Sequence, residues 1–245
     1  MSKNIFVGLV LLVLSWSCNQ EKTAEQIVQS TIQTYGGDAV YSSKVAFDFR
    51  NKHYSAKYKD GLFQLERNFE DTLGIILDVL NNDGFVRTIG DSIVELDEEW
   101  TGKYSRSVNS VVYFFRIPFV LTDQAVRLKR LADGVINGKK YYKIETTFGE
   151  EGGGDDFDDR FIYWINSENY NIDYLGYSYS TDGGGKRFRE AINWRTINGL
   201  LVADYINYEP KDLNVPLEEY DVYFAEDGMK ELSRIENKNI TIEYF

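Results

Sequence analysis

The sequence has little of what most metal, thiol and nucleic-acid functions need. Among its 245 residues there is one cysteine and one histidine. One cysteine excludes an intramolecular disulfide, and one histidine excludes a site built from several histidines. Basic residues are also scarce, since 27 Lys and Arg stand against 39 Asp and Glu and give a net charge of −12 at pH 7. Binding a phosphate backbone needs a concentrated basic surface, so we expect no nucleic acid partner.

Aromatic residues, in contrast, are abundant. The chain has 15 Phe, 4 Trp and 18 Tyr within a hydrophobic content of 43%. That content is sufficient for a packed core in a chain of this length. There is no internal repeat and no linker rich in proline or serine, which predicts one domain over residues 23–245, and we expect a monomer.

The first 17 residues have the pattern of a secretory signal. Lys3 precedes an apolar run over residues 5–14, and small or aromatic residues lead to Cys18. The run is too short for a membrane span, which needs about 20 apolar residues. We therefore expect residues 1–17 to direct the chain out of the cytoplasm and to be removed.

The only cysteine stands directly after this segment and before a polar stretch over residues 19–22. This position resembles the lipobox of bacterial lipoproteins, although Ser15 occupies a position where that family favours leucine. The resemblance implies that Cys18 carries a diacylglycerol and that residues 18–22 form a tether to a membrane. Asn19, where aspartate would favour retention at the inner membrane, implies an outer-membrane location facing either the periplasm or the exterior. An ordinary signal peptide followed by an unmodified cysteine is the alternative.

A helix opens the predicted domain. Thr23 and Gln26 have the spacing of a capping box. Apolar residues then recur at helical intervals until Gly36 ends the pattern. The sequence therefore predicts one amphipathic helix between Thr23 and Gly36.

Most of the remaining chain alternates with the period of a strand. Val45, Phe47 and Phe49 begin this pattern, and Asp60-Gly61 is a strong hairpin turn. Further strands are predicted over residues 62–69, 75–80, 85–89, 93–96, 141–148, 160–165, 172–180, 187–194, 200–208, 220–224 and 240–244. Short strands with few helices between them predict a mainly β, α+β fold: a curled antiparallel sheet or unclosed barrel plugged by helices.

Residues 111–121 interrupt the alternation. They are apolar on nearly every side and contain Pro118. We predict a helix that ends at this proline and is buried on the concave side of the curled sheet.

An acidic, glycine-rich loop over residues 149–160 is the main candidate for a metal site. It contains the carboxylates of Asp155, Asp156, Asp158 and Asp159. Extracytoplasmic calcium prefers such hard oxygen ligands, but the spacing differs from an EF-hand. A solvated hairpin loop that binds nothing is the favoured alternative, and no other cofactor is expected.

No motif predicts catalysis. His53 lies on the polar face of a predicted strand, without a G-x-S-x-G motif elsewhere to supply a nucleophile. Residues 181–186 lack the spacing of a phosphate-binding loop and are better explained as a hairpin turn. Paired carboxylates on the acidic loop leave a carbohydrate-active enzyme as a less favoured hypothesis.

The aromatic residues are the candidate binding surface. Their period-two spacing places many of them on one face of the curled sheet, where they either fill a core or line a cavity. The candidate ligand-binding residues are Phe47, Phe49, Tyr54, Tyr58, Phe114, Phe115, Phe119, Tyr177, Tyr179 and Trp194.

Four segments in the second half of the chain carry a family resemblance. They are residues 161–166 (FIYWIN), 172–177 (IDYLGY), 197–202 (INGLLV) and 206–208 (INY). This pattern resembles the LolA/LolB-like lipoprotein carriers, and more closely a group of uncharacterised Gram-negative outer-membrane lipoproteins with that fold. The resemblance implies an unclosed antiparallel barrel whose apolar concavity holds acyl chains, with residues 111–121 as its plug.

Our first hypothesis is a membrane-anchored, non-enzymatic protein that binds an acyl, lipid or lipoprotein ligand in this cavity. The alternative is a structural or partner-binding envelope lipoprotein whose interior is filled.

Overall fold

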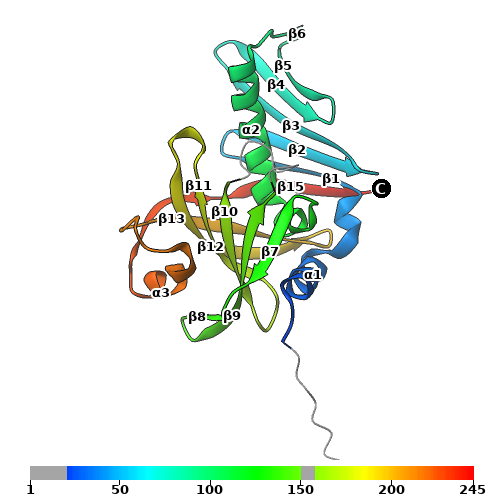
Figure 1. Ribbon diagram of the computed structural model, residues 1–245. Helices are drawn as coiled ribbons and strands as arrows, with labels where there is room; N and C mark the ends of the chain where they lie inside the picture. Colours follow the sequence, from blue (N-terminus) through cyan, green and yellow to red (C-terminus); the bar gives the residue numbers. More distant parts are fainter. Residues whose placement is uncertain (1–20, 150–157) are drawn as a thin grey trace, which may run out of the picture.

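The computed structural model describes residues 21–149 and 158–245, which form two antiparallel sheets and a few helices (Figure 1). The predicted signal segment, Cys18, Asp155 and Asp156 lie outside the described residues. The seven-stranded sheet contains, in order, β15 (Asn237–Tyr244), β1 (Ser43–Phe49), β2 (Lys52–Lys59), β3 (Leu62–Asp71), β4 (Gly74–Asn81), β5 (Gly84–Ile89) and β6 (Ser92–Ile93). The eight-stranded sheet contains β14 (Met229–Ile235), β13 (Leu200–Pro210), β12 (Gly185–Ile197), β11 (Ile172–Tyr179), β10 (Arg160–Asn166), β9 (Lys139–Phe148) and β7 (Val126–Arg130), with β8 (Gly134–Ile136) paired to β9.

The two sheets meet where β14 leads into β15. Only Glu236 separates these strands. β14 pairs with β13 in the eight-stranded sheet, and β15 pairs with β1 in the seven-stranded sheet. The backbone N–H of Asn237 donates a hydrogen bond to Asp204 on β13 at 3.1 Å, which holds the junction. The result is an unclosed, bent antiparallel arrangement, as the sequence predicts.

Tight turns set the register of the hairpins. Asp60 and Gly61 have φ of 52° and 79°, and they join the paired residues Lys59 and Leu62. Positive φ at both central residues matches the right-handed twist of the strands, which explains the preference for glycine at the second position. The predicted hairpin turn at Asp60-Gly61 is thus confirmed, and residues 181–183 likewise form a short turn between β11 and β12.

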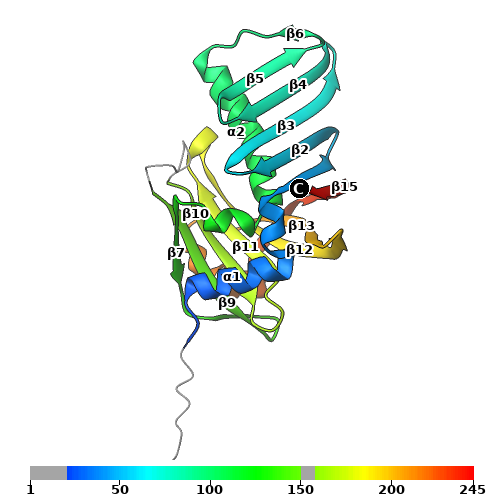
Figure 2. The ribbon, with the colours of Figure 1, turned by 90° about the vertical axis from the view of Figure 1, so that its right-hand side faces the viewer.

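Helix α1 (Ala24–Tyr35) begins and ends as predicted. Thr23 and Gln26 form a complete capping box, with Thr23 Oγ1 accepting from the Gln26 N–H at 3.3 Å. The buried face of α1 lies against the concave side of the eight-stranded sheet (Figure 2).

Helix α2 (Glu98–Phe115) corrects the prediction for residues 111–121. The helix begins 13 residues earlier than position 111 and ends at Phe115. The remaining residues form a turn and the 3-10 helix η2 (Phe119–Thr122), whose first three residues are buried. The apolar segment is therefore the last turn of a long amphipathic helix followed by a buried loop, because Asp97 provides the N-cap that starts the helix far upstream.

Both faces of the eight-stranded sheet are covered. Phe161, Tyr163 and Ile165 of β10 belong to the main core on the concave side, while Ile162 and Trp164 belong to a second core on the opposite side. Helix α3 (Tyr220–Ala225) and the 3-10 helix η5 (Leu217–Glu219) contribute to this second core.

The strand predicted over residues 220–224 is wrong, since these residues form α3. Tyr220 and Phe224 lie one helical turn apart, and both pack against Phe188 at ring-centroid distances of 6.1 and 5.2 Å. Residues i and i+4 lie on the same face of a helix, as alternate residues do in a strand, so the apolar pattern of this segment fits either element. The sequence pattern also does not predict strands β7, β8 and β14.

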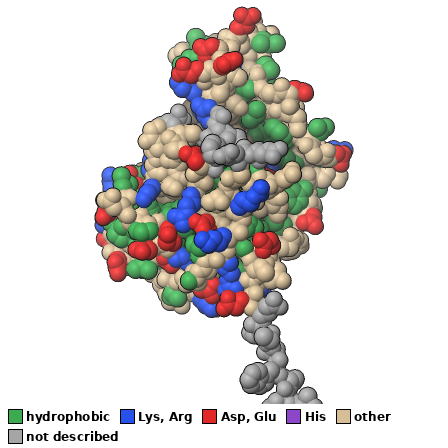
Figure 3. All heavy atoms as spheres, viewed as in Figure 1, with side chains coloured by type: hydrophobic (Ala, Val, Ile, Leu, Met, Phe, Trp, Pro, Cys, Tyr) green, Lys and Arg blue, Asp and Glu red, His purple; other side chains and the backbone are tan. Residues whose placement is uncertain are grey.

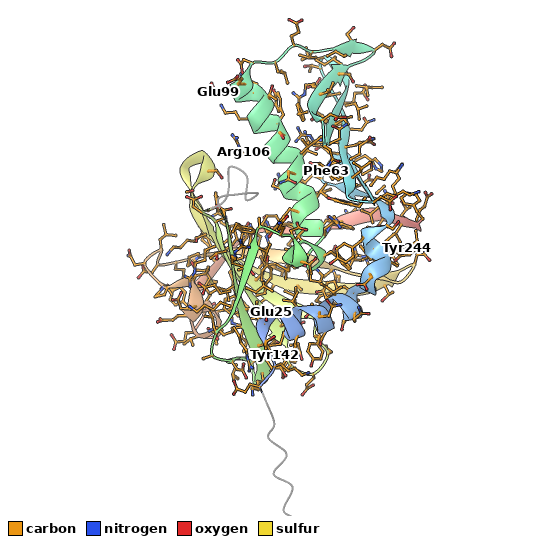
Figure 4. The ribbon with its side chains drawn as sticks, turned by 45° about the vertical axis from the view of Figure 1, so that its right-hand side comes forward. Glu25, Phe63, Glu99, Arg106, Tyr142 and Tyr244 are labelled. Carbon is orange, nitrogen blue, oxygen red and sulfur yellow. The ribbon has the colours of Figure 1, made fainter. Side chains whose placement is uncertain are left out.

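Arginine side chains attach α2 to the seven-stranded sheet. Asp78 on β4 is fully buried and accepts hydrogen bonds from Arg67 on β3 and Arg87 on β5 at 2.6 Å each. Arg67 also donates to Ser107 on α2 at 2.6 Å, and Arg87 lies 3.3 Å from the ring centre of Tyr104 on the same helix. In Figure 4, α2 extends alongside this sheet from Glu99, past Arg106, towards the junction of the two sheets.

Candidate functional site

A hollow lined mainly by aromatic side chains lies between the last turns of α2 and the concave face of the eight-stranded sheet. We call it the aromatic cavity. Its volume is about 290 Å³, and its lining residues are Asn109, Ser110, Tyr113, Phe114, Phe148, Asp159, Phe161, Tyr177, Tyr179 and Thr181. Strands β9, β10 and β11 supply the wall that faces the helix.

A second hollow lies beside the same stretch of α2, where the two sheets join. We call it the arginine cavity. Its volume is about 230 Å³, and its lining residues are Phe49, Arg50, Ser110, Val111, Phe114, Phe115, Arg189, Tyr205, Asn207, Ser233, Ile235 and Asn237. Ser110 and Phe114 line both hollows, so the two cavities are neighbouring spaces that share a wall.

Arg189 on β12 lies at this shared wall. Its guanidinium carbon is 3.8 Å from the ring centre of Phe114 and 5.2 Å from that of Tyr177. Its Nη2 donates a hydrogen bond to the Tyr177 hydroxyl at 2.9 Å. The arginine is thus held between α2 and β11, against Phe114, which lines both cavities, and Tyr177, which lines the aromatic cavity.

The interior around the cavities is poorly solvated. Burial raises the pKa of Tyr205 in the arginine cavity to about 12, although the positive charge of Arg189 acts in the opposite direction. Burial likewise raises the pKa of Tyr113 in the aromatic cavity. Both phenols therefore stay neutral well above physiological pH, and neither places a negative charge beside the cavities.

The ten predicted aromatic residues separate into two groups. Five of them line a cavity: Tyr177 and Tyr179 the aromatic cavity, Phe49 and Phe115 the arginine cavity, and Phe114 both. The other five pack into or against the main core: Phe47, Tyr54, Tyr58, Phe119 and Trp194.

The core group shows how much of the interior is filled. Phe47 stacks on Phe115 with ring centres 4.0 Å apart and on Tyr54 with centres 5.6 Å apart. Trp194 contacts Tyr35 edge to face. The interior is therefore largely packed, and the two cavities lie where the last turns of α2 leave space beside the sheets.

Arg189, Asn207, Tyr113 and Phe161 line the cavities but are not among the predicted residues. The alternation on β12 holds a usable signal for Arg189. Phe188 packs into the second core, so its neighbour Arg189 must point to the concave side, where the main core lies. An arginine on the inward face of a predicted strand marks a polar position inside the fold.

The other candidates lie elsewhere. Asp158 accepts a hydrogen bond from Ser180 at 2.6 Å, while the buried Asp159 lines the aromatic cavity. Within residues 21–149 and 158–245 there is no group of three His, Cys, Asp or Glu side chains placed to hold a metal. His53 is exposed and contacts Asp48 at 2.7 Å, and it lines neither cavity. In the same described ranges, no helix has the length and apolar character needed to cross a membrane.

Comparison with known proteins gives a family and a fold. A family model described as a family of unknown function (DUF6503) matches residues 3–237. No curated protein sequence matches the chain.

Among solved structures, a LolA superfamily protein from Nitrosomonas europaea is similar, with a TM-score of 0.54 at 11% identity over 92% of this chain and 96% of that one. A putative outer membrane lipoprotein-sorting protein domain from Vibrio parahaemolyticus gives 0.43 at 9% identity, over 90% and 92% of the two chains. The lipoprotein LppX from Mycobacterium tuberculosis gives 0.28 at 15% identity, over 64% and 89%. The first of these establishes a LolA-like fold.

Proposed function

We propose that this chain, which belongs to the DUF6503 family of unknown function, is a non-enzymatic envelope lipoprotein that binds the acyl part of a lipid or lipoprotein. The observation that carries the proposal is the aromatic cavity, where Phe114, Phe161 and Tyr177 surround space beside the end of α2. Together with the adjoining arginine cavity it falls in the volume range of about 300–1,000 Å³ that small-molecule sites occupy.

Apolar burial would drive the binding. Each square ångström of acyl surface removed from water contributes roughly 25 cal/mol, before the cost of ordering the ligand is subtracted. Aromatic walls suit this role because they bury a large area with few rotatable bonds.

The anchor is the second part of the proposal. The position of Cys18 after the signal segment supports lipid attachment, and Asn19 supports sorting to the outer membrane. An anchored protein with an acyl-binding cavity would act as a receptor or sensor at the membrane, whereas a soluble carrier moves between membranes.

A purified mature chain with Cys18→Ser, produced without the signal segment, tests the binding proposal. Native mass spectrometry followed by lipid extraction should reveal a bound acyl species, or one taken up after incubation with a fatty acid. A protein that remains empty in both experiments would favour the alternative, a filled envelope lipoprotein that acts through partners. The stack of Phe47, Tyr54 and Phe115 is the observation that favours this second candidate.

A further inference from the structure

We propose that the ligand is an anionic amphiphile, whose acyl chain occupies the aromatic cavity and whose carboxylate or phosphate headgroup occupies the arginine cavity against Arg189. This inference rests on the proposed function and specifies the chemical class of its ligand. Carboxylate and phosphate groups share the feature that matters here, which is an anionic oxygen that accepts hydrogen bonds from a guanidinium.

The charged residues that line the two cavities have opposite signs. Among the described residues, Arg50 and Arg189 are the charged residues of the arginine cavity, and no carboxylate lines it. Among the described residues that line the aromatic cavity, Asp159 is the charged one. An anionic headgroup is therefore attracted to the arginine cavity, which sets the orientation that we propose for the ligand.

Two buried polar atoms of the arginine cavity have no hydrogen-bond partner among the described residues. They are Nε of Arg189 and Oδ1 of Asn207. The two residues are directly opposite each other on β12 and β13, so both atoms belong to one small region of the wall. Buried donors and acceptors are normally paired, and an unpaired guanidinium N–H is unfavourable until an acceptor arrives. The Asn207 amide can also turn to present its N–H group.

The position of Arg189 is already fixed without a ligand. The hydrogen bond from Nη2 to Tyr177 and the contact with Phe114 hold the guanidinium plane, while Nε stays unpaired. A headgroup bound there needs little reorganisation of the protein. Since Phe114 lines both cavities and Tyr177 lines the aromatic one, the headgroup position is one side chain away from the acyl position.

On the face seen in Figure 3, Lys and Arg side chains are interspersed with Asp and Glu side chains over the eight-stranded sheet. We therefore assign the selectivity for an anion to Arg189 and the exposed Arg50, in a chain whose net charge is −12.

The experiment compares four probes on the mature Cys18→Ser chain by calorimetry below their micellar concentrations. The probes are dodecanoate, dodecyl phosphate, dodecanol and inorganic phosphate. We expect at least one of the two anionic amphiphiles to bind about tenfold to a hundredfold more tightly than dodecanol, which is the range of a charge-assisted hydrogen bond. Arg189→Gln should remove this preference, so that the anionic amphiphiles bind no more tightly than dodecanol does. Arg187→Gln is the matched control, because Arg187 is on the same strand but lines neither cavity.

The outcomes separate the inference from the function on which it rests. Equal binding of dodecanol and both anionic probes, or a preference that persists in Arg189→Gln, would overturn the inference and leave acyl binding intact. Inorganic phosphate bound as tightly as dodecyl phosphate would also overturn it, since the site would then recognise a free anion. Failure of all three twelve-carbon probes to bind would contradict the proposed function itself. Dodecanol binding by Arg189→Gln shows that the variant is folded.

Discussion

Asp78 is the residue whose loss we expect to be felt most strongly. It is fully buried between Arg67 and Arg87, and its side chain is the counter-charge for both. Asp78→Ala leaves two buried guanidinium groups uncompensated, which is expected to cost about 3–5 kcal/mol in the free energy of unfolding. Urea denaturation measures this loss. The control is Lys230→Met, which breaks an exposed pair with Glu209 and should change stability by less than about 1 kcal/mol. Similar losses for the two variants would contradict the role given to Asp78.

Ser110 provides a residue-scale test of the cavities. It is exposed on α2 and lines both of them, so Ser110→Trp places a large ring in the space that we propose for the ligand, without disturbing the core. We expect fatty acid binding to weaken at least tenfold, with little change in the thermal unfolding midpoint. Gln33→Trp, at an exposed site on α1 that lines neither cavity, should bind like the parent chain. Undiminished binding by Ser110→Trp would place the ligand elsewhere.

At the scale of elements, the end of α1 is fixed by a close approach. Gly36 has φ of 129°, and a Cβ atom there would lie 2.9 Å from the carbonyl oxygen of Gly199 in the β12–β13 turn. Gly36→Ala combines an unfavourable backbone conformation with this clash. Gly61→Ala serves as comparison, because Gly61 also has positive φ but open space around it. We expect Gly61→Ala to cost about 1–2 kcal/mol and Gly36→Ala more, as measured by chemical denaturation. Equal costs would mean that the turn moves away from the helix freely.

The elements that the sequence predicts correctly are those with strong local signals. Helix α1 has a capping box and a terminal glycine, and β2 and β3 flank the Asp60-Gly61 turn. The predictions for α2 and α3 are wrong for a physical reason. Helix α2 presents Ser107 and Tyr104, not an apolar stripe, to the sheet residues Arg67 and Arg87. Helix α3 presents only one helical turn to Phe188. Half of the predicted aromatic residues line the cavities. The alternation on β12 indicates an inward position for Arg189, whereas Asn207 can be assigned only once β13 is placed beside β12.

The abundance of buried phenols affects the whole molecule at alkaline pH. Burial raises the pKa values of Tyr174, Tyr205 and Tyr220 to about 12, compared with about 10 in an unfolded chain. Between these values the native state keeps protons that the unfolded state has lost. The free energy of unfolding is therefore undiminished below about pH 10 and falls as the pH rises towards 12.

Denaturation series at increasing pH, combined with the ultraviolet absorbance of tyrosinate, measure this effect. A part of the tyrosinate signal should appear only as the protein unfolds. Tyr205→Phe should show a shallower loss of stability with pH than the parent chain. Complete tyrosine titration near pH 10 in a protein that keeps its native circular dichroism would contradict the burial of these phenols.

The pairing of β1 with β15 has a consequence for the order in which the molecule is built. The strands from β1 to β5 are joined by short hairpins and can form in sequence, but the neighbour of β1 on its other side comes late: Asn239 on β15 contacts Asp48 on β1 across 191 residues. Contacts of such long range form slowly, because the intervening chain must be organised first. Until then β1 is an open sheet edge, and the junction that carries the arginine cavity does not exist. We therefore expect the edge of β1 to stay exposed until late in folding, and the arginine cavity to form only once β15 has paired with β1.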